Sequence, residues 1–281
     1  MSWFSTDRLP RPHDTVRRDV AWTRWNELAA PPEDASARAL LDALFGNSPY
    51  LTELVLRNPS FMSDLWRRGP DEVQRDLDAE LDAVKTSARA GQAPTEIATA
   101  LRRLKSRLSL AIAVADIAGA WPLERITGAL SAFASGCLAA LVDSILLQLA
   151  RDGQLAIGNE PDAAALTVLG MGKLGAGELN YSSDIDLILL YDREAPALAD
   201  NDNLSRHFVR AARLLVQLMG ETSADGYIFR TDLRLRPDPG STPLAMSVQA
   251  AELYYESVGQ NWERAAMIKA HPVAGNLPVG E

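Results

Sequence analysis

Two carboxylates separated by one residue stand at the start of a strongly apolar run. Asp184 and Asp186 flank Ile185, and the run continues through Tyr191, which predicts a buried β-strand. Residues i and i+2 of a strand point to the same face, so both carboxylates converge on one point. Two anions this close repel each other unless a cation lies between them, and Mg²⁺ is the natural candidate because it prefers oxygen ligands and substrate phosphates. An isolated Asp-x-Asp can equally be two solvated aspartates.

A third carboxylate, Asp232, strengthens the metal interpretation. Residues 227–235 alternate in polarity and predict a strand whose charged face carries Arg230, Asp232, Arg234 and Arg236. If this strand lies beside the first, Asp232 joins the pair, and three carboxylates can hold two metal ions for in-line displacement at phosphorus. The arginines would bind phosphate oxygens. Salt bridges among Arg230, Asp232 and Arg234 are the alternative interpretation.

A glycine-rich loop over residues 170–177 precedes these carboxylates and follows a short apolar strand. It satisfies G-x-G-x-x-G, and Asp192 lies about 20 residues further on, so a dinucleotide-binding unit is a competing interpretation. Only eight residues separate its last fingerprint glycine, Gly175, from Asp184, too few for a crossover helix. A P-loop also fails, because Lys173 precedes Gly175. We therefore expect the loop amides and the start of a short helix to approach phosphates.

The chain divides into three parts by pattern. Residues 1–35 contain four prolines among mixed charges and predict an irregular N-terminal segment. Residues 36–157 repeat apolar residues at helical spacing and predict an all-helical region. Residues 158–281 mix strand-like and helical runs, which predicts a domain containing both strands and helices. Helices are predicted in this last part over residues 204–219, from about residue 247 and around residue 262.

Local signals mark particular helices in the helical region. An apolar stripe ends at Gly46, which predicts a C-cap there, and Ser48 followed by Pro49 predicts the start of the next helix. Residues 126–150 are apolar enough to suggest a membrane span. Polar groups such as Asp143 interrupt that stretch, so we predict a buried helix of a soluble protein and no transmembrane segment.

Composition narrows the classes of partner and site. The chain has 281 residues, 47% of them apolar, which is enough to bury a core and excludes wholesale disorder. Its net charge of −9 disfavours nucleic acid and anionic membranes as partners, so any phosphate site must be a local exception. The single cysteine, Cys137, excludes an internal disulfide and suits a reducing compartment such as the cytoplasm. Three scattered histidines disfavour a histidine-built zinc centre.

Together these motifs resemble the polymerase-β-type nucleotidyltransferase superfamily. Its pattern begins here at Met171-Gly172, continues through ten residues after Lys173 to Asp184-Ile-Asp186, and ends with Asp232 on a later strand. Lys173 departs from the small residue usual at that position. The resemblance implies an α+β fold, in which the helical region is followed by a nucleotidyltransferase domain with a small mixed sheet flanked by helices.

Longer segments are similar to the glutamine synthetase adenylyltransferase family. These are Leu-Gly-Met-Gly-Lys-Leu-Gly-Ala-Gly-Glu-Leu-Asn-Tyr-Ser-Ser-Asp-Ile-Asp-Leu (169–187), Arg-Thr-Asp-Leu-Arg-Leu-Arg-Pro (230–237) and Asn-Trp-Glu-Arg-Ala-Ala-Met-Ile-Lys-Ala (261–270). That family carries two nucleotidyltransferase domains in one long chain. The N-terminal one removes AMP from a tyrosine of glutamine synthetase by phosphorolysis, and the C-terminal one adds it from ATP. Gly-Met-Gly-Lys-Leu-Gly and Ser-Ser-Asp-Ile-Asp resemble the adenylyl-removing half, so we expect this chain to be a C-terminally truncated fragment of a longer protein.

The resemblance implies roles for individual residues. Asp184, Asp186 and Asp232 would be catalytic and hold Mg²⁺. Lys269 would reach the nucleotide, because residues 262, 266 and 269 share a face if one helix carries them. The nucleotide- and phosphate-binding residues implied are Gly172, Lys173, Gly175, Ser183, Arg234, Arg236 and Lys269.

The same resemblance names partners and leaves alternatives open. Glutamine synthetase would be the protein substrate, with ATP or ADP and phosphate as small ligands and the PII signal protein as a regulatory partner. Adenylyl transfer from ATP to the same tyrosine uses the same site geometry, so residues alone separate the two directions poorly. A catalytically silent docking module for glutamine synthetase or PII is a third interpretation.

Overall fold

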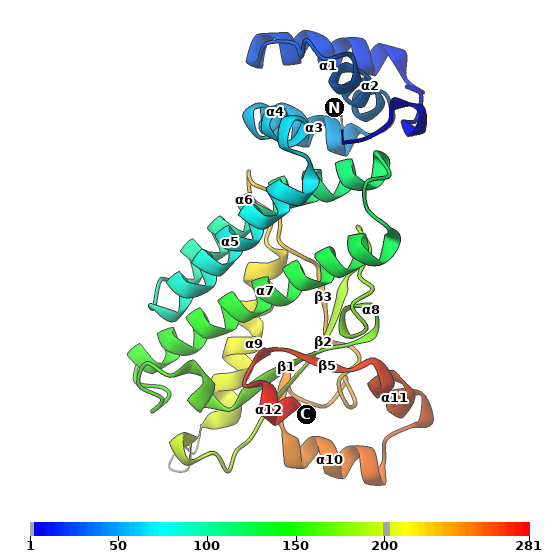
Figure 1. Cartoon of the computed structure of the whole chain (residues 1–281). Coiled ribbons are helices and arrows are strands. Elements are labelled where there is room, and N and C mark those ends of the chain that lie inside the picture. Colours follow the sequence, from blue (N-terminus) through cyan, green and yellow to red (C-terminus); the bar gives the residue numbers. More distant parts are fainter. Residues whose placement is uncertain (1–2, 199–202) are drawn as a thin grey trace. The chain divides into compact units, whose positions relative to one another are not determined.

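A computed structural model describes residues 3–198 and 203–281 (Figure 1). The chain forms two compact units: a helical unit of Met1–Glu80 with Arg103–Ile126, and a sheet unit of Leu81–Arg102 with Thr127–Glu281. The boundary predicted between residues 157 and 158 differs from this division, which falls within long helices. Periodicity locates a helix, whereas a unit boundary depends on what each turn packs against. The three long helices are α5 (Pro70–Arg89), α6 (Pro94–Ile117) and α7 (Leu123–Arg151).

The N-terminal segment is helical, contrary to the predicted irregular structure. A 3₁₀ turn, η1, spans Thr6–Arg8, and helix α1 spans Thr15–Leu28. The four prolines lie outside α1 on either side, so they bound the helix without interrupting it. The Asp14 carboxylate accepts a hydrogen bond from the Arg17 amide at 2.8 Å and caps the first turn.

Three short helices follow in the helical unit: α2 (Ala35–Asn47), α3 (Pro49–Arg57) and α4 (Pro59–Arg68). The predicted start of α3 is confirmed, since the Ser48 hydroxyl accepts from the Leu51 amide at 3.2 Å. The predicted C-cap at Gly46 is wrong, because α2 continues through Asn47. A Cβ at Gly46 would lie 2.4 Å from the Pro12 Cβ. This glycine therefore permits a close approach of Pro12.

Helix α7 contains the apolar stretch that suggests a membrane span. Among the described helices it alone is long and apolar enough to cross a membrane, and 78% of its most apolar window is buried inside the protein. Asp143 lies in this helix with its side chain only 6% exposed, and it pairs with Arg89 at 2.8 Å. The burial agrees with the predicted core helix.

The strands of the sheet unit form one mixed sheet. In the described chain they are β1 (Leu166–Gly170), β2 (Ile185–Tyr191), β3 (Thr231–Asp232), β4 (Ala245–Ser247) and β5 (His271–Gly275). The sheet order is β3-β2-β1-β5, and β4 also pairs with β2. Strands β1 and β2 are antiparallel, with β5 antiparallel on the other side of β1, whereas β3 and β4 run parallel to β2.

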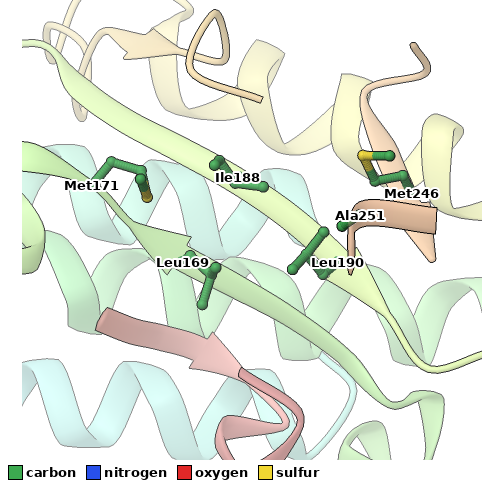
Figure 2. Close-up of a cluster of buried hydrophobic side chains, with 6 residues drawn as sticks. All are labelled: Leu169, Met171, Ile188, Leu190, Met246 and Ala251. Carbon is green, nitrogen blue, oxygen red and sulfur yellow. The ribbon is translucent and has the colours of Figure 1, made fainter. Parts of the chain in front are cut away.

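Helices flank this sheet, which confirms the predicted α+β fold. Helix α9 (Leu204–Gly220) packs against β3 and β4, α10 (Val248–Ser257) against β2 and β4, and the short α12 (Leu277–Gly280) against β1 and β5. Figure 2 shows the apolar cluster formed by Leu169, Met171, Ile188, Leu190, Met246 and Ala251. Since side chains alternate along a strand, Asp186 continues the row of Ile188 and Leu190 on this face of the sheet.

The predicted strand over residues 227–235 is mostly absent. Of residues 227–235, only Thr231 and Asp232 pair with β2. The amides of Ile228 and Phe229 both donate to the Met219 carbonyl, 3.0 Å away at the end of α9, and both side chains are buried. Two adjacent buried side chains break the alternation of a strand. The backbone follows the end of α9 here and joins the sheet only at residue 231.

Candidate active site

The start of β2 brings the three predicted carboxylates together. Asp184 immediately precedes this strand and Asp186 is its second residue. Strand β3 runs parallel to β2 with Thr231 opposite Ile185 and Asp232 opposite Asp186. The strand is shorter than predicted, but it lies beside β2, which is the condition that the metal interpretation sets. The register of two residues is enough to place Asp232 next to Asp186.

Two of these carboxylates form ion pairs with the arginines that flank β3. Asp184 Oδ1 accepts from Arg230 Nε at 2.5 Å, and Arg230 also donates to the Ser182 carbonyl at 2.8 Å. Asp232 accepts from the Arg234 guanidinium at 2.5 and 2.8 Å and from the Arg234 amide at 2.8 Å. These hydrogen bonds, chiefly those of the Arg234 side chain, hold the pKa of Asp232 below its ordinary value.

Asp186 has the opposite electrostatic environment. It is half-buried, and this desolvation, followed by repulsion from Asp232 and Asp184, raises the pKa of its carboxyl, with Arg234 partly offsetting the rise. Its two neighbours each have an arginine of their own. The start of β2 therefore carries a negative charge that a proton or a cation would neutralise.

The side chains as they stand do not form a closed metal centre. The described residues contain no group of three or more His, Cys, Asp or Glu side chains arranged to hold a metal ion. The reason is that Asp184 and Asp232 are turned to their arginines. In kind and in strand register the three carboxylates fit Mg²⁺, which prefers hard oxygen ligands. A metal ion placed here would compete with Arg230 for Asp184 and with Arg234 for Asp232.

The glycine-rich loop is fixed beside Asp186. The Met171 amide donates to the Asp186 carbonyl at 2.9 Å, and the single-turn helix α8 (Gly172–Gly175) follows. Gly172 has φ +53°, a conformation that favours glycine, and a Cβ there would lie 3.6 Å from Asp186 Oδ2. The first amides of α8, which have no partner within the helix, therefore begin close to the carboxylates.

The other end of α8 is packed against the segment that carries Lys269. A Cβ at Gly175 would lie 1.9 Å from the Lys269 carbonyl oxygen and 2.3 Å from that of Gly170. The Lys269 ammonium donates to Glu178 Oε2 at 3.0 Å. The predicted single helix through residue 269 is wrong, because α11 (Asn261–Ala266) ends at Ala266 and a 3₁₀ turn, η4 (Met267–Lys269), follows. Lys269 reaches the loop through backbone packing and this ion pair.

The remaining predicted phosphate ligands have different surroundings. Lys173 is exposed on α8. The Ser183 hydroxyl is hydrogen-bonded to the Asn180 side chain. Arg236 donates to the backbone carbonyls of Leu233 and Pro239, both at 2.8 Å, and thereby closes the loop after β3. Arg236 is therefore engaged within its own loop, whereas Lys173 and the exposed Arg234 side chain have access to solvent.

Two residues of the site have partners that the sequence analysis did not predict. Arg230 was expected to bind phosphate or to form salt bridges within its own segment, yet it is the partner of Asp184. Glu178, the partner of Lys269, lies 91 positions away in sequence. The only hint in the sequence is that Glu178 lies between the glycine loop and Asp184, because no local pattern predicts a contact between residues so far apart.

Comparison with known proteins confirms the family resemblance. The family model for glutamate-ammonia ligase adenylyltransferase matches residues 39–281. Similar curated proteins are bifunctional glutamine synthetase adenylyltransferase/adenylyl-removing enzymes. That of Rhizobium meliloti (strain 1021) is 44% identical over 253 residues, covering 88% of this chain and 26% of the relative. That of Rhodopseudomonas palustris (strain ATCC BAA-98 / CGA009) is 42% identical over 287 residues, covering 97% and 28%. The chain thus spans about a quarter of the length of these relatives. It belongs to the glutamate-ammonia ligase adenylyltransferase family.

Proposed function

We propose that this chain carries a nucleotidyltransferase site that removes AMP from an adenylylated tyrosine of glutamine synthetase by Mg²⁺-dependent phosphorolysis. An oxygen of hydrogen phosphate attacks the α-phosphorus of the AMP group, and the bond from that phosphorus to the tyrosine oxygen breaks. The tyrosine oxygen takes the proton that the hydrogen phosphate gives up, and ADP is released. We also propose that the chain acts in the cytoplasm and that its activity contributes to the control of nitrogen assimilation.

One observation carries the proposal: Asp232 lies opposite Asp186 in parallel strands, beside Asp184 and the glycine loop. Three carboxylates held together at a strand start have no evident benefit for folding, because burial and mutual repulsion disfavour the charged form of Asp186. A site that binds a metal and phosphates gives that arrangement a use. The names of the relatives specify adenylyl transfer and removal on glutamine synthetase.

The contacts suggest how the residues divide the work. Asp184, Asp186 and Asp232 would hold Mg²⁺, which supplies charge stabilisation for the attacking and leaving oxygens. Phosphate oxygens would be bound by the first amides of α8, at Gly172 and Lys173, and by the Lys173 side chain.

The other predicted ligands divide into two groups. Arg234, exposed beside Asp232, would bind phosphate directly, and Lys269 would contact the nucleotide, with Glu178 as its partner in the absence of ligand. The contacts of Gly175, Ser183 and Arg236 favour positioning roles, because each holds a loop in place through neighbouring backbone or side-chain groups.

The direction of transfer rests on sequence detail. Gly-Met-Gly-Lys-Leu-Gly at 170–175 and Ser-Ser-Asp-Ile-Asp at 182–186 resemble the adenylyl-removing half of the family. The relatives are named for both activities and this chain matches only part of each, so adenylylation from ATP is the principal alternative. A silent docking module for glutamine synthetase or PII is the second.

The decisive experiment incubates the chain with adenylylated glutamine synthetase, phosphate and Mg²⁺ and measures ADP. We expect ADP release that disappears in Asp186→Asn and persists in Arg193→Gln, which removes an exposed charge after β2. If the chain instead transfers AMP from labelled ATP to unmodified glutamine synthetase, and releases no ADP from the adenylylated form, its activity is adenylylation. Tight binding of either form without any transfer would support the docking module. Adding PII to the active reaction tests whether it regulates the site.

A further inference from the structure

The exposed face of helix α9 carries a run of arginines that the proposed reaction does not use. Arg206, Arg210 and Arg213 recur at i, i+4 and i+7, so they lie along one side of the helix. The opposite side is apolar and packs on the sheet, where the Phe208 ring lies 4.6 Å from that of Tyr191. Within the described chain none of the three arginines has an acidic partner within 4.0 Å. The described part of the sheet unit thus leaves these three adjacent positive charges without a carboxylate partner.

These arginines line a cavity. It has a volume of about 850 Å³ and lies between α9 and the segment after α7, where Gln154 contributes to its wall. Cavities of about 300–1,000 Å³ accommodate nucleotide-sized ligands. Ser205, His207 and Val209 also line the cavity. Among the described lining residues only Val209 is apolar, so the lining is polar and basic, which favours a charged ligand over an apolar one.

His207 adds an independent observation. Its Nδ1 atom is buried without a hydrogen-bond partner among the described residues. Buried polar atoms are normally paired, and an unpaired one commonly indicates a missing water, ion or ligand. His207 also lines the cavity, so the unpaired nitrogen belongs to a side chain of the cavity wall, although this atom itself is not exposed to the cavity.

The charge and spacing define the chemical class of ligand. Seven residues of α-helix span about 10 Å, which exceeds the width of one phosphate group. Guanidinium groups match phosphate oxygens in a bidentate manner. The chain as a whole has a net charge of −9, so the positive charge of this cavity is a local feature of its arginines.

From these observations we propose that the α9 cavity, defined by Arg206, Arg210, Arg213 and His207, binds a small molecule that carries at least two phosphate groups. The site is separate from Asp184, Asp186 and Asp232, none of which lines the cavity. It does not depend on the direction, or even the existence, of adenylyl transfer. Occupancy would stabilise the packing of α9 on β3 and β4.

Calorimetry with inorganic pyrophosphate in EDTA tests the proposal, since the candidate active site repels polyphosphate when no metal is present. We expect binding by the intact chain and a rise in its melting temperature. Removing two guanidinium contacts, in Arg210→Gln combined with Arg213→Gln, should weaken binding about tenfold or more. Arg193→Gln, which removes a single positive charge outside the cavity, should leave the affinity within about twofold, the scale of a surface charge effect.

Three results would overturn the proposal: no binding by the intact chain, equal loss in Arg193→Gln and the double variant, or citrate binding as tightly as pyrophosphate. The first two exclude a site at α9, and the third excludes phosphate as its class of ligand. Circular dichroism of each variant checks folding, and the single variant Arg206→Gln provides a second, milder test. An Arg234→Gln variant, which removes an arginine of the candidate active site, should still bind pyrophosphate in EDTA; loss of binding in this variant would place the pyrophosphate at the candidate active site instead.

Discussion

Replacing Asp186 by asparagine changes the charge of the candidate site while leaving its shape almost intact. Burial and the neighbouring carboxylates Asp232 and Asp184 disfavour the charged form of this residue. Those neighbours are paired with Arg234 and Arg230, so Asp186→Asn deprives no arginine of its partner. If the carboxylate is a metal ligand, the metal-free protein should be more stable without its charge.

The size of the gain follows from Coulomb repulsion reduced by screening. Two like charges 4 Å apart repel by about 1 kcal/mol in water and about 4 kcal/mol near a protein surface. Arg230 and Arg234 neutralise much of the neighbouring charge, and Asp186 keeps substantial contact with solvent, which leaves about 0.5–1 kcal/mol. In a protein of this size that gain raises the melting temperature by about 1–4 °C.

Thermal unfolding in EDTA, and again in Mg²⁺ with ADP, measures both effects. Asp186→Asn should melt above the parent chain in EDTA, lose the stabilisation by Mg²⁺ and ADP, and release no ADP from adenylylated glutamine synthetase. The matched control, Asp184→Asn, should also be inactive but gain no stability, because it removes the partner of Arg230. An Asp186→Asn protein that melts several degrees lower in EDTA, or that retains activity, would refute the reasoning.

Three other changes test the structural account. Gly175→Ala should destabilise the sheet unit by about 3 kcal/mol or more in urea unfolding, because its Cβ would overlap the Lys269 backbone carbonyl; a neutral result would contradict that packing. Burial raises the pKa of Asp143 above its ordinary value despite Arg89, so the folded chain gains stability as pH falls through that pKa; Asp143→Asn should be the more stable protein at pH 7, and the difference should vanish near pH 4. Arg236→Lys should unfold about 1–2 kcal/mol more easily, because one ammonium cannot span two carbonyls, whereas a direct phosphate ligand would change the KM for phosphate and leave stability unaltered.

The parts of the site that local pattern controls were predictable. A run of apolar residues after Asp186 fixed the position of β2 within the chain, and period-two alternation put Asp184 and Asp186 on one face. The pairing of β3 with β2 was a condition of the metal interpretation, since a third carboxylate completes a metal site only if the two strands are neighbours. The structure has that pairing, with Asp232 opposite Asp186.

The parts that depend on distant partners were not predictable. Ile228 and Phe229 leave the expected strand because their amides bond to Met219, and no pattern within residues 227–235 indicates that contact. Gly46 was predicted to end a helix, yet its role is to admit Pro12. A glycine has the same local signal whether it ends a helix or permits a close approach.

If the site binds a metal ion as proposed, the arginine pairs explain how it can fold before the ion arrives. The Asp184–Arg230 pair is exposed on both sides, and the Arg234 side chain that holds Asp232 is 84% exposed. Exposed ion pairs contribute little to stability, so exchanging Arg230 for a metal ion at Asp184 costs the fold little, whereas the Asp232 side chain is only 16% exposed and needs a replacement cation when Arg234 leaves. In the proposed reaction, each arginine displaced in this way would remain within two residues of Asp232, which the pairing of β3 with β2 holds beside Asp186. Its positive charge would then be available to phosphate oxygens at the moment when the metal takes over the carboxylates.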